Sequence, residues 1–150
     1  MQRSLNLASI LIPLIKEDKE GAFKDIEGLA YTASTTQILK SVVGEKRPEG
    51  NSHKSFPSGH ASASFQAATF LQLRYGYKYG IPSFIVATLV AYSRVQAKRH
   101  YWHDVIAGAM LGAGFSYLVQ RTKYSLYNLA FAPTISGDRI GFLLTMNFKS

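Results

Sequence analysis

The chain has 150 residues, a length typical of one domain with its own hydrophobic core. It carries 17 lysine and arginine residues against 9 aspartate and glutamate residues, so its formal net charge is +8, and it has no cysteine. The lack of cysteine excludes disulfides and thiolate metal sites, and the positive charge favours an acidic partner such as a phosphate ester or an anionic bilayer. No nucleic-acid binding is expected, because the basic residues are scattered and show neither zinc-finger spacing nor an aromatic RNA-binding signature.

The first 43 residues predict two helical segments separated by a charged connection. Residues 4–15 are mostly apolar, with Pro13 near their end, and residues 16–21 form a polar loop. The first segment lacks a clear cleavage site for a secretory signal, and it equally suits the end of a helix that begins earlier. Residues 22–43 predict one long helix, which the following glycine and Pro48 end.

Three more helices are expected before residue 121, with a glycine-bounded turn at residues 75–80. Residues 107–114 give the last of these helices a face of small residues that suits close contact between helices. Because successive helices joined by short turns run antiparallel, the chain near residues 44–60 and 94–104 should meet at one end of the bundle. The three helices are expected at residues 59–74, 81–93 and 102–120.

The last 25 residues have a different pattern. From Ile140 to residue 148 apolar side chains occupy every second position, which predicts a strand with one buried face. Residues 136–138 predict a turn, and residues 127–132 predict the partner strand. The expected fold is therefore one all-α domain over residues 1–150, an antiparallel bundle of about five helices with a short β-hairpin within residues 125–150.

A histidine and an aspartate four residues apart are the first candidates for chemistry. If their segment is helical, His100 and Asp104 lie on one face, where the carboxylate accepts a hydrogen bond from one imidazole nitrogen. The other nitrogen then keeps its lone pair for attack on an electrophile. By itself the pair also suits a surface contact at the start of a helix, but two other segments carry matching chemistry.

The second segment opens a helix with Ser58 and Gly59, directly before His60. The free N–H groups of a helix start attract an anion, which the histidine can reach. In the third segment Lys40 and Arg47 are seven residues apart, so two helical turns would put both cations on one side. Together these groups favour phosphoryl transfer, in which one histidine attacks phosphorus and the other protonates the leaving oxygen.

Three motifs follow one another: Lys-x6-Arg-Pro at residues 40–48, Pro-Ser-Gly-His at residues 57–60 and Ser-Arg-x5-His-x3-Asp at residues 93–104. In this order they resemble the signature of the type 2 phosphatidic acid phosphatase family, which includes bacterial class A acid phosphatases, glucose-6-phosphatase and vanadium haloperoxidases. All three match without substitution and span somewhat under half of the chain. The resemblance implies hydrolysis of a phosphomonoester or of the terminal phosphate of a diphosphate, with no metal and no cofactor.

The matched positions imply a role for each residue. His100 is the expected nucleophile, forming a phosphohistidine that water hydrolyses, and Asp104 orients it. His60 is expected to protonate the departing alkoxide and then to activate the water. For each cation the simpler interpretation is a solvated surface charge, and for the serine a helix cap. The residues expected to bind the phosphate are Lys40, Arg47, Ser58, Gly59 and Arg94.

Other interpretations stay open. Nitrogen and carboxylate ligands suit zinc, so a metal-dependent hydrolase is one alternative, although the three cations would repel a metal ion. A membrane scaffold that keeps the motif residues without turnover is another, and a vanadium peroxidase is chemically adjacent because vanadate mimics the phosphorus transition state. The residues of the hypothetical metal cluster are His53, His60, His100, His103 and Asp104.

Membrane association is expected even though the helices are short. Residues 59–74 and 81–93 fall below the roughly 20 apolar residues that a bilayer core requires, yet residues 85–91 are almost continuously apolar. The family includes both integral membrane proteins and soluble periplasmic enzymes. The expected location is therefore an inner membrane, with the site facing the periplasm, or the periplasm itself. A phosphorylated lipid or a small phosphate ester is the expected substrate, and the motifs specify neither the leaving group nor the oligomeric state.

Overall fold

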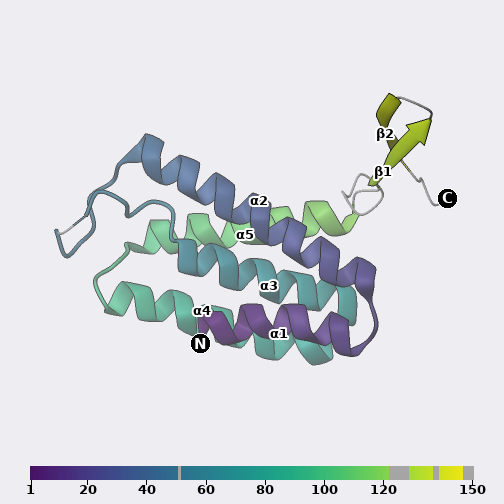
Figure 1. Ribbon diagram of the computed structural model, residues 1–150. Helices are drawn as coiled ribbons and strands as arrows, with labels where there is room; N and C mark the ends of the chain where they lie inside the picture. Colours follow the sequence, from purple (N-terminus) through teal and green to yellow (C-terminus); the bar gives the residue numbers. More distant parts are fainter. Residues whose placement is uncertain (51, 122–128, 137–138, 147–150) are drawn as a thin grey trace.

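The computed structural model describes residues 1–50, 52–121, 129–136 and 139–146. The described part contains five α-helices that lie roughly along one direction, with α3 in the middle (Figure 1). The predicted helical bundle is therefore confirmed. The helices are α1 (Gln2–Ile15), α2 (Lys19–Val43), α3 (Gly59–Tyr75), α4 (Tyr77–Gln96) and α5 (Trp102–Arg121).

Two strands follow the helices in the sequence. β1 (Leu129–Ser136) pairs antiparallel with β2 (Arg139–Met146), and Leu129 lies opposite Met146 in the register. Residues 122–128, 137–138 and 147–150 lie outside the described residues. Two of the three residues of the expected turn are among them, so the C-terminal hairpin with one buried face stays a prediction.

The hydrophobic core forms around α3. Phe70 and Leu71 of this helix are almost fully buried and belong to a cluster with Leu5 from α1 and Ala87 from α4. Burial of large apolar side chains on the middle helix gives the outer helices a common surface to pack on. This packing fixes α3, and with it the segment that opens α3, relative to the rest of the bundle.

Two glycines allow α5 to approach α3 closely. A Cβ atom at Gly108 would lie 2.6 Å from the carbonyl oxygen of Ser58, and one at Gly112 would overlap that of Ser62. No side chain larger than hydrogen fits at either position without moving the backbone. Two of the small residues expected to make a close helix contact do so here, and they set the spacing between the starts of α3 and α5.

Polar side chains cover the inner face of α2. Leu29 and Leu39 are half-buried, whereas five of its large apolar residues are instead 40–77% exposed: Phe23, Ile26, Ile38, Val42 and Val43. The apolar pattern thus predicted the helix correctly but not the direction in which its faces point. None of the five described helices combines the length and the apolar content needed to cross a bilayer. The buried polar residues of α2 are Lys24, Asp25, Glu27, Thr32 and Thr36.

Glycines reverse the chain at both ends of the bundle. Gly44 ends α2 in the left-handed conformation, with φ of 59°, and Gly76 separates α3 from α4 with φ of 79°. The turn predicted at residues 75–80 was too long, because Gly76 alone makes the reversal and α4 begins at Tyr77. The end of α2, the end of α4 and the starts of α3 and α5 lie at one end of the bundle, as the sequence predicted (Figure 1).

Candidate active site

The histidine and aspartate of the third motif are paired and buried. His100 lies in the turn just before α5, and Asp104 lies in the first helical turn; their side chains are 4% and 0% exposed. The Nδ1 atom of His100 is 3.5 Å from Oδ2 of Asp104. The two side chains are therefore adjacent, but Nδ1 makes no hydrogen bond within the described residues, and His100 precedes the helix instead of belonging to it. With Nδ1 on the carboxylate side, Nε2 is the nitrogen available for chemistry.

A serine that the sequence did not single out supports this carboxylate. Ser55 is fully buried, and its hydroxyl donates a hydrogen bond of 2.5 Å to Oδ2 of Asp104. The backbone N–H of Tyr101 donates to the same oxygen at 2.8 Å. Ser55 lies in a connection that is polar throughout, so no pattern distinguished it from its neighbours. Its contact fixes the carboxylate in the orientation that faces His100.

Burial and nearby cations keep the ring of His100 neutral. Burial lowers its pKa first, and the positive charge of Lys40 lowers it further, whereas Asp104 opposes the change; the resulting pKa is about 4. An imidazole that stays unprotonated above this value keeps its lone pair at neutral pH. The surroundings of His100 thus suit a nucleophile or a base.

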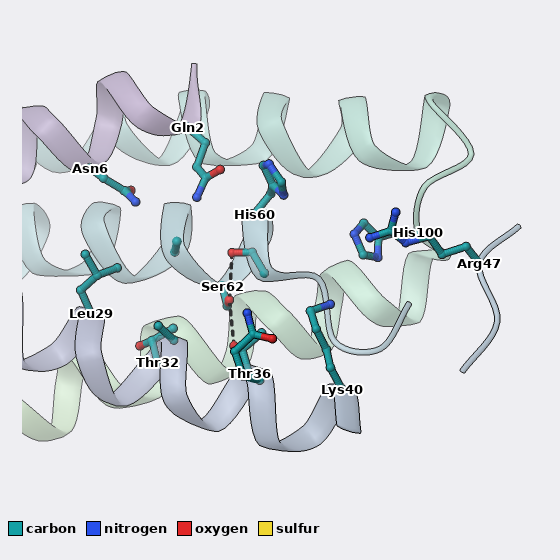
Figure 2. A pocket seen from close by; sticks show the side chains of 14 residues that line it. Gln2, Asn6, Leu29, Thr32, Thr36, Lys40, Arg47, His60, Ser62 and His100 are labelled. Carbon is teal, nitrogen blue, oxygen red and sulfur yellow. Dashed lines mark hydrogen bonds between the residues drawn. The ribbon is translucent and has the colours of Figure 1, made fainter. Parts of the chain in front are cut away.

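His100 opens into a cavity of about 440 Å³ that also contains groups from the other two motifs. Lys40 from α2, Arg47 from the following loop, and Gly59 and His60 from the start of α3 line it (Figure 2). All three motifs therefore meet at one cavity. The rest of the lining is largely hydroxyl and amide side chains from α1, α2 and α3: Gln2, Asn6, Thr32, Thr36, Gln37 and Ser62.

The two cations of the first motif reach the cavity from different elements. Lys40 lies in the last turn of α2, and its ammonium group donates to the carbonyl oxygens of Lys54 at 3.1 Å and Pro57 at 2.5 Å. Burial, followed by the charge of Arg47, lowers its pKa. Arg47 itself lies in the loop, where its backbone N–H donates to the backbone carbonyl of Ser52 at 2.9 Å. The prediction that one helix carries both cations was wrong, because α2 ends at Gly44.

His60 lies between this cavity and a neighbouring one. The second cavity, of about 390 Å³, is lined by His60, Gln2, Arg3 and Arg94, whereas Arg94 does not belong to the lining of the first cavity. Partial desolvation lowers the pKa of His60 first, and the charges of Arg94 and Lys40 lower it further. A bound phosphate would offset these positive charges and help His60 to hold a proton.

Ser58 caps α3. Its side chain accepts a hydrogen bond from the N–H of Ala61, and its own N–H donates to the carbonyl of Asp104 at 3.0 Å. Ser58 is fully buried and is not part of the cavity lining. The simpler interpretation of this serine as a helix cap therefore describes its contacts. The cap ties the start of α3 to the start of α5 and leaves the first N–H groups of α3 without intrahelical partners.

The metal cluster considered from the sequence is not assembled as expected. Among the residues that the structure describes, one group of histidine and carboxylate ligand atoms lies within 4.8 Å of one another, and it consists of Glu45, His103 and Asp104. Neither His60 nor His100 belongs to it, and His53 is exposed in the loop. Within the described residues, the two histidines of the cavity therefore do not belong to a group of three such ligands.

Comparison with known proteins identifies the family. Residues 26–127 match the PAP2 superfamily, and this match contains all three motifs. The chain belongs to the PAP2 superfamily. The resemblance to the type 2 phosphatidic acid phosphatases is thereby confirmed.

Named relatives of this PAP2 chain include lipid phosphatases. The lipid A 4'-phosphatase of Helicobacter pylori is 39% identical over 114 residues, which cover 75% of this chain and 57% of that protein. The lipid A 1-phosphatase of Porphyromonas gingivalis is 33% identical over 110 residues, which cover 71% of this chain and 24% of that protein. The chain thus spans little more than half of the first relative and about a quarter of the second.

A solved structure shares the fold. The crystal structure of LpxE from Aquifex aeolicus superposes with a TM-score of 0.67, and the match covers 81% of this chain and 84% of that chain. The sequence identity is 22%, so this likeness concerns the arrangement of the helices.

Proposed function

We propose that this chain is a phosphatase that cleaves a phosphomonoester, or the terminal phosphate of a diphosphate, without a metal ion. One observation carries the proposal: His100, held against Asp104, opens into the same cavity as Lys40, Arg47 and His60. A nucleophile, an acid and two cations around one space meet the needs of phosphoryl transfer. Relatives named as lipid A phosphatases and lipid phosphate phosphatases support the same reaction type.

The first step transfers the phosphoryl group to the enzyme. Nε2 of His100 attacks phosphorus, and the bond from phosphorus to the leaving oxygen breaks. His60 donates its proton to that oxygen, so the alcohol leaves neutral. Lys40 and Arg47 neutralise the charge on the phosphate oxygens, and the N–H of Gly59 at the start of α3 adds a further donor.

The second step releases phosphate. His60, now neutral, takes a proton from water, whose oxygen attacks phosphorus and breaks its bond to His100. Asp104 favours the positively charged imidazole that exists between the two steps, because its Oδ2 atom faces Nδ1. In this proposal Arg94 binds the phosphate from the side of His60, and Ser58 acts by holding the start of α3 in place.

We propose a phosphorylated lipid as the substrate. The relatives carry names that refer to lipid A, lipid phosphates and undecaprenyl diphosphate. Large apolar side chains are exposed on every helix, and they offer a surface for acyl chains or a bilayer. We therefore favour a membrane location with the site facing the periplasm, and a soluble periplasmic enzyme is the second possibility.

The central experiment compares phosphate release by the wild type, His100→Gln and His53→Ala. The assay uses an aryl phosphate and then lipid A, phosphatidic acid, phosphatidylglycerol phosphate and a polyprenyl diphosphate. We expect His100→Gln to lose turnover on all substrates and His53→Ala, a change at an exposed histidine, to keep it. Equal rates in the wild type and His100→Gln would contradict the proposal and favour a scaffold or a different reaction centre.

A chelator and vanadate separate this reaction from metal-dependent hydrolysis. We expect turnover to survive chelation and to be inhibited by vanadate, which occupies the phosphate site as a transition-state mimic. Enzyme quenched in alkaline denaturant during turnover should carry a phosphoryl group that is stable in alkali and is lost in acid, as a phosphohistidine is. Loss of activity on chelation, restored by zinc, would instead support the metal-dependent alternative.

A further inference from the structure

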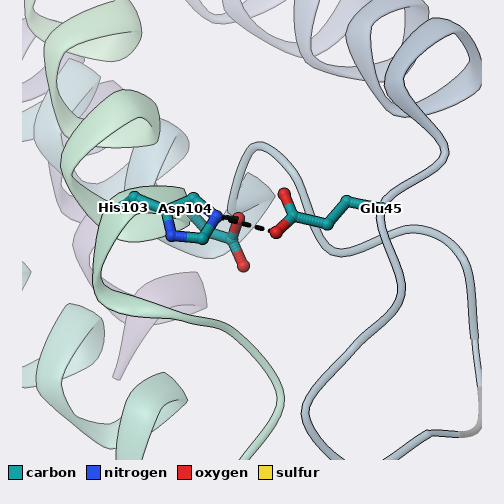
Figure 3. Close-up of side chains that lie close together, drawn as sticks. All are labelled: Glu45, His103 and Asp104. Atoms are coloured by element: carbon teal, nitrogen blue, oxygen red, sulfur yellow. Dashed lines mark hydrogen bonds and ion pairs between the residues drawn. The ribbon is translucent and has the colours of Figure 1, made fainter.

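Three ligand-type side chains meet at Oδ1 of Asp104, whereas His100 lies beside Oδ2. The Nε2 atom of His103 lies 2.8 Å from Oε1 of Glu45 and 3.2 Å from Oδ1 of Asp104 (Figure 3). Glu45 comes from the loop after α2, and the other two residues come from the first turn of α5. Neither Glu45 nor His103 lines the 440 Å³ cavity or takes part in the proposed reaction.

The two oxygens of Asp104 have different surroundings. Oδ2 accepts hydrogen bonds from Ser55 and from the N–H of Tyr101, and it faces His100. Oδ1 is buried and makes no hydrogen bond within the part of the chain that the structure describes, and Nε2 of His103 lies 3.2 Å from it. A buried carboxylate oxygen without a donor is costly, so it favours a cation as its partner.

The imidazole of His103 is held in place yet open to solvent. Its ring stacks on Tyr101, with centroids 5.3 Å apart and planes 9° apart, and it also lies against Phe56 at 6.2 Å. Its side chain is 57% exposed, so an ion in solution can reach it. The carbonyl of Glu45 accepts from the N–H of Ser55 at 2.9 Å, which fixes the loop that brings the third ligand.

The donor set points to a particular class of ion. One imidazole nitrogen with two carboxylate oxygens suits zinc and similar transition metals, whereas calcium and magnesium favour all-oxygen sites. We propose that Glu45, His103 and Asp104 bind a divalent transition-metal ion of the zinc type, and that the bound ion inhibits the reaction at His100. The inhibitory part rests on the proposed phosphatase function, and the binding part does not.

Inhibition follows from the shared carboxylate. An ion on Oδ1 withdraws negative charge from the carboxylate whose Oδ2 faces Nδ1 of His100. The imidazolium formed during phosphoryl transfer is then less stabilised, so turnover slows. The ion also ties the loop of Glu45 to α5, and this loop carries Arg47. The site differs from the catalytic zinc considered from the sequence, because it excludes the histidines of the cavity.

Metal binding is tested first, without reference to turnover. Zn²⁺ is titrated into the purified full chain in competition with a chromophoric chelator, and Co²⁺ reports coordination through its visible spectrum. We expect one ion per chain in the wild type and in His53→Ala. In His103→Ala and in Glu45→Gln we expect the affinity to fall by at least the roughly tenfold loss that even outer partners of a metal site can cause.

Several results would overturn the site. One is equal Zn²⁺ affinity in the wild type, His103→Ala and Glu45→Gln, and another is the absence of any bound ion, which would leave His103 as a proton donor to two carboxylates. A third is a loss of Zn²⁺ binding in His60→Ala while His103→Ala still binds the ion as the wild type does, which would place the ion in the cavity. Circular dichroism checks that each variant is folded. If His103→Ala does not fold, Glu45→Gln still tests the site.

Inhibition is tested by hydrolysis of an aryl phosphate at rising Zn²⁺, with each variant compared with its own chelated rate. We expect Zn²⁺ to inhibit the wild type and His53→Ala, and to inhibit His103→Ala only at concentrations about tenfold higher or more. Vanadate should inhibit all three. Zinc binding without an effect on turnover would overturn the inhibitory part alone, and activation by zinc would favour a catalytic metal. A chain that binds zinc but never hydrolyses a phosphate would refute the proposed function and leave the metal site intact.

Discussion

Replacement of Asp25 by asparagine should stabilise the protein at neutral pH. Asp25 lies on the inner face of α2 and is 1% exposed. Its Oδ1 atom accepts from Nε2 of Gln66 at 3.0 Å, while Oδ2 is buried without a donor in the described part of the chain. Burial raises the pKa of this carboxyl from 3.8 to about 6, although the hydrogen bond from Gln66 opposes the change. At neutral pH the folded state therefore holds a carboxylate in a place that favours the neutral acid.

The size of the effect follows from the pKa. A carboxyl with a raised pKa binds its proton more tightly in the folded state than in the unfolded state. Its contribution to stability is therefore complete below pH 3.8 and is lost as the pH rises through about 6. At about 1.4 kcal/mol per pKa unit, the ionised group costs about 3 kcal/mol of stability at pH 7. Asparagine has nearly the same shape and keeps an oxygen for Gln66, so Asp25→Asn should recover up to about 3 kcal/mol.

Denaturant unfolding followed by circular dichroism measures this difference at about pH 7.5 and about pH 4. We expect Asp25→Asn to be more stable than the wild type at the higher pH and equal to it at the lower pH. Asp18→Asn is a matched control with the opposite sign, because the hydrogen bonds from Arg74 lower the pKa of Asp18 and its ionised form stabilises the fold. A variant at position 25 that is less stable at neutral pH would refute the reasoning, as would a difference that does not change with pH.

The pH dependence of kcat/KM for an aryl phosphate should be bell-shaped, because activity needs His100 neutral, above a pKa of about 4, and His60 protonated, below its lowered pKa. A rate that keeps rising above neutral pH would contradict these roles. Asp104→Asn should lower kcat by about a hundredfold to ten thousandfold with little change in KM, measured by steady-state kinetics; an unchanged kcat would exclude Asp104 as the orienting group. Gly112→Ala should cost about 1–3 kcal/mol in denaturant unfolding, because its Cβ would overlap the backbone of α3. Gly114→Ala, with open space around it, is the control, and an equal loss in both variants would point to the glycine backbone instead of packing.

The helices and the meeting of the motifs could be predicted from the sequence because both depend on local rules. Apolar spacing and glycine positions define the helices, and short connections force successive helices to run antiparallel. The segments that carry Lys40, His60 and His100 consequently had to reach the same end of the bundle. The three motifs themselves were sufficient to place the chain in its family, which the match over residues 26–127 then confirmed.

Other features depend on contacts between distant residues, and only the tertiary structure decided them. Ser55 supports Asp104 across 49 positions of sequence, and nothing in a polar loop marks one serine as the donor. Glu45 reaches His103 across 58 positions for the same reason. Asp25 on the inner face of α2 has Gln66 of α3 as its partner across 41 positions, and no local pattern indicates that contact. Local patterns determine where helices begin and end, but the free energy that selects a buried partner comes from packing between elements, which only the folded chain specifies.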